Sequence, residues 1–127
     1  MDLLIIVNED SDIVYSQGFN QADEIERCRL ILLAYGSIDV INDLVHRTRD
    51  NYFDCIDSYI KHDISVFIFP SFYKAIFVHS RKKNTKKFLY EVHRIFKTMI
   101  INKMIKDFQI AQEFINERIE ETYREMF

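Results

Sequence analysis

The first apolar and polar positions of the chain have the pattern of a β-hairpin. Residues 3–7 are apolar without interruption, residues 8–12 supply polar turn chemistry, and residues 13–15 resume with β-branched and aromatic side chains. Continuous apolarity predicts that the first strand is covered on both faces. The second strand is bordered by polar residues, so we expect it at an edge of the sheet.

The segment from about residue 20 to residue 46 has the period of one long helix. Gly36 interrupts this pattern. Because glycine inside a helix costs about 1 kcal/mol relative to alanine, Gly36 predicts a close crossing over another element, with a merely tolerated glycine as the alternative. Apolar side chains that recur every three or four positions are expected to form the buried stripe: Ile25, Cys28, Leu32, Tyr35, Ile38, Ile41 and Val45.

Three strands and two helices are expected in the rest of the chain. Residues 52–60 mix aromatic, apolar and acidic positions, which indicates an edge strand with one wet face. Residues 64–69 and 74–79 are apolar at both parities and predict a hairpin covered on both sides. Helical periodicity returns after residue 84, and a last amphipathic helix is expected from about residue 106 to the end. This order predicts an α+β fold: one antiparallel sheet with one helix on one face and two on the other.

Length and composition fit one domain that spans residues 1–127. The chain is 48% hydrophobic, with only two glycines and one proline, which disfavours disorder and suffices for a core. A formal net charge of −3 gives no basic balance, so nucleic acid is not an expected partner. No apolar run approaches the roughly 18 residues of a membrane-spanning helix, and secretion is not indicated. Any membrane contact is therefore expected to be peripheral.

The sequence carries no recognisable catalytic or metal-binding motif. Gly18 and Gly36 lie outside any phosphate-binding glycine pattern, and there is no nucleophile elbow or paired-histidine zinc motif. Cys28 and Cys55 are interpreted as free, buried thiols in a reducing compartment. We therefore expect no catalytic residue, metal, cofactor or small-molecule substrate. Four widely separated histidines are interpreted as surface or capping residues: His46, His62, His79 and His93.

A basic segment follows the fifth expected strand. It is interpreted either as a solvated connection or as a contact with anionic lipid head groups or an acidic partner, because each basic side chain near such a surface adds about 1 kcal/mol. A nucleic-acid patch is a weaker alternative, since Phe88 and Tyr90 nearby fit a helix. The segment's cations are Arg81, Lys82, Lys83, Lys86 and Lys87.

Four other residues are candidates for contact with a partner protein. Asp39 and Asp43 place carboxylates in the back half of the first helix, either as part of a solvated face or as part of a partner surface. Phe72 and Tyr73 lie in the connection between the last two strands, either as buried aromatics or as exposed anchors for a partner.

Two stretches of the chain resemble the sedlin family. One runs AYGSIDVIND from Ala34 to Asp43, with Asp39 as the acidic residue after the family's apolar pair, and the other spans residues 52–80. With the order of elements, the resemblance covers residues 1 to about 105. The chain departs from the family at residues 101–105, which lack an Asn-Pro-Phe-Tyr-like stretch. It also departs in the basic loop before the second helix, so partner contacts at that loop are not carried over.

The resemblance implies a longin/profilin-like fold whose five strands lie in the order 2-1-5-4-3. It also implies a non-catalytic subunit or adaptor of a TRAPP-like vesicle-tethering complex in endoplasmic reticulum to Golgi transport. Such a protein would be cytoplasmic, peripherally associated with endoplasmic reticulum and Golgi membranes, and partnered by other TRAPP-like subunits. TRAPP complexes activate a Rab GTPase by nucleotide exchange, but a sedlin-like subunit would contribute assembly surfaces.

Two other classes of function remain open at the level of the sequence. One is another longin-type trafficking component, such as an adaptor-complex small chain or a SNARE regulatory domain, because the same fold hosts several trafficking roles. The other is an enzyme or a ligand-binding domain, which a deep polar pocket with strongly perturbed titratable groups would support.

Overall fold

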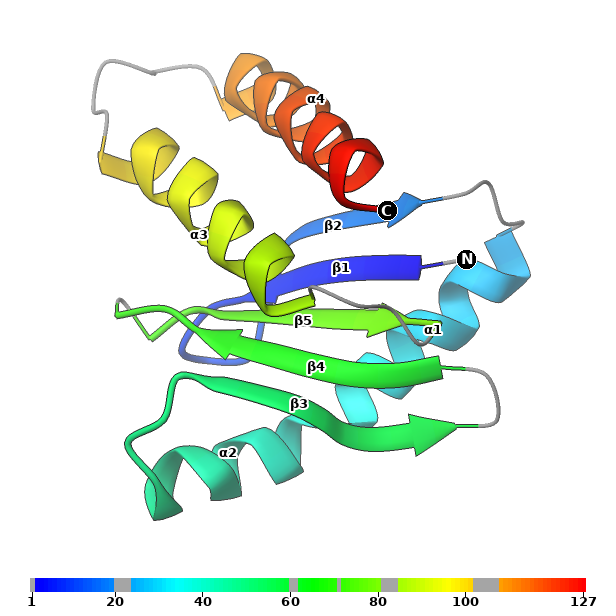
Figure 1. Cartoon of the computed structure of the whole chain (residues 1–127), viewed down its shortest axis with the longest axis vertical. Coiled ribbons are helices and arrows are strands. Elements are labelled where there is room, and N and C mark those ends of the chain that lie inside the picture. The colour runs from blue at the N-terminus through cyan, green and yellow to red at the C-terminus, as the bar shows by residue number, and fades with distance from the viewer. Residues whose placement is uncertain (1, 20–23, 60–61, 71, 81–84, 102–107) are drawn as a thin grey trace.

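The computed structural model shows a five-stranded sheet with helices packed on both faces (Figure 1). The structure describes the chain except residues 1, 20–23, 60–61, 71, 81–84 and 102–107. The strands lie in the order β2-β1-β5-β4-β3 and every neighbouring pair is antiparallel. The predicted α+β fold and the strand order are thereby confirmed. The elements are β1 (Asp2–Val7), β2 (Ile13–Phe19), α1 (Glu24–Gly36), α2 (Ile38–Arg47), β3 (Tyr52–Tyr59), β4 (His62–Ile68), β5 (Lys74–His79), α3 (Thr85–Ile101) and α4 (Phe108–Met126).

Strand β1 divides its side chains between two cores. Leu4 and Ile6 belong to the core beneath α3 and α4. Leu3, Ile5 and Val7 belong to the core beneath α1 and α2. Because successive side chains of a strand point to opposite faces, a run that is apolar at both parities is what a doubly covered strand requires.

The core beneath α3 and α4 is rich in aromatic rings. Phe19 of β2 stacks on Tyr123 of α4 with the ring centroids 4.1 Å apart. Phe77 of β5 lies 4.9 Å from Phe88 of α3, again between ring centroids. Each contact joins a helix to the sheet, and pairs of this kind contribute about 0.5–1.5 kcal/mol beyond the burial of their area. The last two helices therefore share one face of the sheet, as the sequence predicted.

The long helix predicted from residue 20 to residue 46 is wrong, because two helices, α1 and α2, meet at Ser37. The Ser37 hydroxyl donates to the carbonyl oxygen of Ala34 at 2.6 Å, and its backbone N–H donates to the same oxygen at 3.1 Å. Glycine and serine side by side often interrupt a helix. The close crossing expected at Gly36 is also wrong, since a Cβ built there would meet no atom within 4 Å. Residues 20–23 of the predicted helix lie outside the described residues.

The buried side of α1 differs from the predicted stripe. Leu30 and Ala34 are fully buried, whereas Ile25 and Leu32 of the predicted stripe are largely exposed. The prediction failed because residues 30–35 are all apolar, so the sequence offers no polar side there to fix the helix rotation. The later members of the stripe do pack in the core: Ile38, Ile41 and Val45.

Two predictions about reactive side chains were wrong as well. Cys28 and Cys55 were expected to be buried, but both are exposed. Cys55 has a φ of 50° and lies where the register between β3 and β4 shifts, as in a β-bulge, so this part of the edge strand leaves the regular ladder. His62 and His79, which were expected to be surface or capping residues, are buried.

Candidate partner-binding surface

An exposed apolar stripe runs along α1 on the side turned away from the sheet. Its members lie three or four residues apart and form what we call the outer α1 face: Ile25, Cys28, Leu32 and Tyr35. Ile25 is 81% exposed, Leu32 is 71% exposed and Tyr35 is 44% exposed. Large apolar side chains that gather on one surface mark a contact with another molecule, whereas single ones need no explanation. The outer α1 face is therefore a candidate for protein binding.

Contacts with three strands fix the rotation of α1. Leu30 and Ala34 lie one helical turn apart and pack in the core that β1 and β5 share with this helix. Arg27 Nη2 donates to the Ser16 hydroxyl on β2 at 3.1 Å. With these side chains turned inward, Leu32 must point outward.

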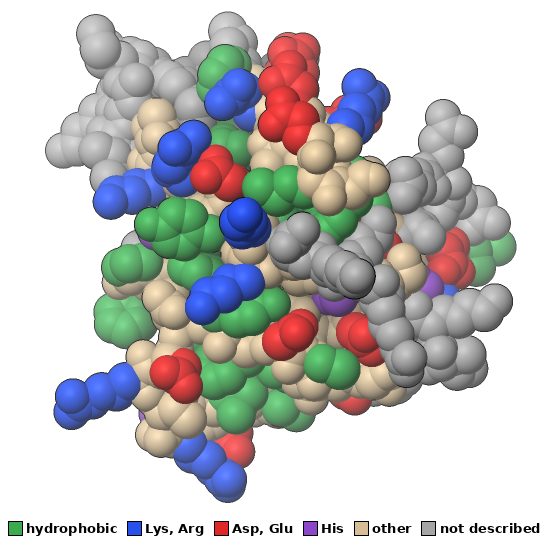
Figure 2. Space-filling model, viewed as in Figure 1, with side chains coloured by type: hydrophobic (Ala, Val, Ile, Leu, Met, Phe, Trp, Pro, Cys, Tyr) green, Lys and Arg blue, Asp and Glu red, His purple; other side chains and the backbone are tan. Residues whose placement is uncertain are grey.

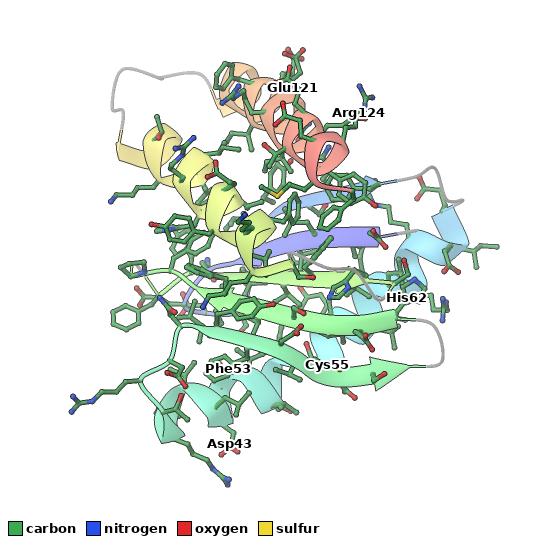
Figure 3. All side chains as sticks on the ribbon, viewed as in Figure 1. Asp43, Phe53, Cys55, His62, Glu121 and Arg124 are labelled. Carbon is green, nitrogen blue, oxygen red and sulfur yellow. The ribbon has the colours of Figure 1, made fainter. Side chains whose placement is uncertain are left out.

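Asp39 and Asp43 extend the exposed surface along α2, which follows α1 over the same face of the sheet (Figure 1). Both are exposed, and their spacing of four places them on one side of the helix. Asp43 lies 3.2 Å from Arg47 and points away from the sheet (Figure 3). Asp39 stands in the first helical turn, where the helix dipole favours a negative charge. Each carboxylate thus has a local role and stays accessible to a partner.

Of the two candidate aromatics in the β4–β5 connection, only Phe72 is exposed. It is 63% exposed and its φ is 68°, a backbone conformation that non-glycine residues rarely adopt. Tyr73 is half-buried, and its ring centroid lies 6.0 Å from that of Phe96 on α3. Phe72 is thus placed to contact a partner, whereas Tyr73 packs mainly against α3.

Lys86 and Lys87 of the basic segment are exposed in the first turn of α3. The ammonium of Lys86 lies 5.7 Å from the ring centroid of Tyr52, a cation–π contact. Burial and the nearby Asp54 carboxylate raise the pKa of Tyr52 to about 12, so its hydroxyl stays neutral at physiological pH. The remaining cations lie outside the described residues: Arg81, Lys82 and Lys83.

The face that carries α3 and α4 has a charged surface. Lysine, arginine and acidic side chains gather over these two helices (Figure 2). They include ion pairs one turn apart, such as Arg124 with Glu120 at 2.9 Å. None of the helices, over the part of the chain that the structure describes, combines the length and the apolar character needed to cross a membrane.

A partly buried polar chain links β3, β4 and β5. The Ser65 hydroxyl lies 2.8 Å from Asp54 Oδ1 and 2.9 Å from His79 Nε2. Burial lowers the pKa of His79, against the opposing attraction of nearby carboxylates. Ser65 is completely buried, so its hydroxyl cannot reach an external substrate. Within the described residues, no three histidine, cysteine or acidic side chains form a group that could hold a metal ion.

The sheet order and the helices on both faces define a longin-like α+β protein, and one side of α1 is apolar and exposed. A family model described as Sedlin matches residues 5–125. The chain therefore belongs to the sedlin family, a family of non-enzymatic trafficking subunits. The match extends through most of α4, beyond the region in which the resemblance was recognised. Comparison with curated proteins gives no match.

Two features of the structure were not predicted from the sequence. The outer α1 face was assigned to the core, although six consecutive apolar residues from Leu30 to Tyr35 exceed what one buried side of a helix can hold. That excess was the available signal for a second, exposed apolar side. The second feature is the burial of Lys74 beside Asn42, which joins residues 32 positions apart and leaves no local sequence signal.

Proposed function

We propose that this protein is a non-catalytic subunit of a TRAPP-like vesicle-tethering complex in transport between the endoplasmic reticulum and the Golgi. Membership of the sedlin family supports the class of function. The exposure of Ile25 and Leu32 on a helix whose opposite side already packs on the sheet carries the proposal for an assembly surface. Removing such apolar side chains from water is favourable, and only another surface can cover them here.

In this proposal the outer α1 face is covered by a neighbouring subunit. Burial of a leucine or isoleucine side chain is worth about 1.5–3 kcal/mol relative to exposure. Because about 1.4 kcal/mol changes an affinity tenfold, one such residue can change the affinity of the contact by a factor of ten or more. Asp39 and Asp43 would add polar contacts beside this face, and Phe72 a second anchor at the far end of α2.

The remaining parts of the proposal concern location. Residues 1–127 act as one domain in the cytoplasm, bound peripherally at endoplasmic reticulum and Golgi membranes through the complex. Lys86 and Lys87 support a contact with anionic lipid or an acidic neighbour, because both side chains are exposed near the same end of α3. Each cation near an anionic membrane surface contributes about 1 kcal/mol.

The test is affinity purification of the tagged protein from its native cells at near-physiological salt, followed by mass spectrometry. The wild type is compared with Leu32→Glu and with Phe114→Glu, a matched control in which an exposed apolar residue of α4 is changed. We expect TRAPP-like subunits with the wild type and the control, and their loss with Leu32→Glu. Recovery of coat subunits would favour the adaptor alternative.

Two results would contradict the proposal. A wild-type protein recovered without partners would reject a stable subunit role. A Leu32→Glu protein that is folded by circular dichroism and keeps its full set of partners would reject the outer α1 face as the interface.

A further inference from the structure

Lys74, the first residue of β5, is a buried cation that forms no ion pair with a carboxylate among the described residues. Its side chain is 7% exposed, and its ammonium donates to Asn42 Oδ1 at 2.9 Å. An ammonium carries three donors, and the neutral amide supplies one acceptor. Among the residues that the structure describes, no carboxylate lies within ion-pair distance of Lys74. Buried lysines are normally paired, because removing a charge from water is costly.

This ammonium borders a pocket of about 360 Å³ at one end of the sheet. Apolar side chains from three elements form part of its wall: Val45 of α2, Ile68 of β4 and Phe72 of the β4–β5 connection. A hydrogen bond closes the turn in this connection: the backbone N–H of Phe72 donates to the carbonyl oxygen of Phe69 at 2.8 Å. A buried cation beside apolar walls is the arrangement that a site for an amphipathic anion requires.

Two other charged or titratable groups border the pocket, Glu9 and His46. Glu9 lies in the β1–β2 turn, which Asn8 holds by accepting two backbone N–H bonds at its side-chain oxygen. The Glu9 carboxylate raises the pKa of Lys74, but burial has the larger effect and lowers it. Since Glu9 is exposed, water screens its charge from an anion that enters the pocket.

We propose that this pocket binds an acidic side chain of a partner protein, with the carboxylate on Lys74 Nζ and a neighbouring apolar residue against Val45, Ile68 and Phe72. The apolar wall and the exposed Phe72 ring favour a peptide over a small inorganic anion, which would use only the ammonium. The inference goes beyond the proposed function, with which it shares only Phe72. The pocket includes no residue of the outer α1 face, and it can be tested on the isolated protein.

The test is a titration of the full chain with the capped tripeptide acetyl-Leu-Glu-Leu-amide, in which ¹H–¹⁵N NMR spectra report binding. We expect saturable shifts at the amides of Asn42, Phe72 and Lys74. The matched peptide acetyl-Leu-Gln-Leu-amide has the same shape without the charge and should bind at least tenfold more weakly. This comparison uses only the wild type, so it holds even if a variant fails to fold.

Three variants sharpen the test. Lys74→Met removes the cation and should abolish binding, whereas Lys97→Met removes an exposed cation of α3 and should leave binding unchanged. Asn42→Asp places a carboxylate of the protein's own beside Lys74 and should compete with the peptide, so binding should again be lost.

The proposal is overturned if no saturable shifts occur, if the glutamate and glutamine peptides bind equally, or if a folded Lys74→Met protein still binds the glutamate peptide. Inorganic phosphate and acetate are titrated in parallel. If either binds as tightly as the glutamate peptide, the pocket is a small-anion site and the partner peptide is rejected. None of these results depends on the assembly into which the protein is recruited.

Discussion

The hydroxyl of Tyr123 in α4 donates a hydrogen bond to Oδ2 of Asp2 in β1, which joins the last helix to the first strand. The other carboxylate oxygen of Asp2 accepts the backbone N–H of Ser80 at 3.1 Å. Both partners of the tyrosine bond are buried. The carboxylate of Asp2 thus connects α4, β1 and the end of β5, near the point where the two chain ends approach one another (Figure 1).

Removal of this hydroxyl should destabilise the protein. In Tyr123→Phe the ring can keep its stack on Phe19, but a buried carboxylate loses a donor, which costs about 1–3 kcal/mol. The free energy of unfolding measured in urea checks this expectation. Tyr90→Phe, at an exposed tyrosine of α3, serves as the control. Equal losses in both variants would contradict the role of the Tyr123 hydroxyl.

Substitution of Gly36 should stabilise the protein. No atom lies within 4 Å of a Cβ at this position, and the glycine has no positive φ, so alanine fits without strain. Alanine also lowers the conformational entropy of the unfolded chain, and Gly36→Ala should raise the free energy of unfolding by about 0.4–1 kcal/mol. Thermal and urea denaturation measure the change. A clear loss of stability would show that something closely covers this position.

The protein should lose stability as the pH falls below neutrality. Burial lowers the pKa of His79, so the unfolded chain binds the proton more readily and stability declines as the pH drops below about 6.5, the ordinary value. The pKa of His93 is lowered by burial and then by Lys97, which adds to the same trend. Each histidine contributes at most about 1.4 kcal/mol per pH unit.

Urea denaturation at pH 7.5, 6.5 and 5.5 tests this dependence. His79→Gln should flatten the decline in part, and the double variant with His93→Gln should flatten it further. His46→Gln changes an exposed histidine of α2 and serves as the control. A pH slope that stays unchanged in the double variant would assign the decline to other groups.

Charge reversal at Lys87 should separate stability from membrane contact. Lys87 lies in the first turn of α3, where the helix dipole favours negative charge, so Lys87→Glu should stabilise the fold by about 0.3–1 kcal/mol. Binding to vesicles that contain anionic lipid should weaken. Each basic charge near such a surface contributes about 1 kcal/mol, so the affinity should fall roughly fivefold for each charge lost. Lys97→Glu gives the same net charge farther along α3. Equal vesicle binding by wild type and Lys87→Glu would reject the lipid contact at this residue.

The sheet could be predicted from the sequence because the local pattern of apolar and polar residues indicates which faces of each strand are buried. In β1, apolar residues at both parities report cover on both faces, and the structure divides them between two cores. The polar residues of the first turn gave the position of the hairpin, where Asn8 caps the loop with its side chain. The strand order itself came from the family resemblance, because a pattern within one strand does not identify its neighbours.

The rotation of α1 and the environment of Lys74 could not be predicted in the same way. Residues 30–35 are apolar all round the helix, so only packing on β1 and β5 decides that Leu30 turns inward and Leu32 outward. Lys74 stands at the start of a strand, where a lysine is ordinarily solvated. Its burial depends on α2 crossing nearby and presenting Asn42, a tertiary contact that no local pattern encodes.

The most direct test of the assembly surface is the rate at which N-ethylmaleimide labels Cys28 in native cell extract and in the purified protein. Cys28 belongs to the outer α1 face, and Cys55 on β3 is a second exposed thiol outside it. If a neighbouring subunit covers the outer α1 face, Cys28 should be labelled at least tenfold more slowly in the extract, while Cys55 serves as the internal reference. Equal labelling of Cys28 in the two samples would contradict the account.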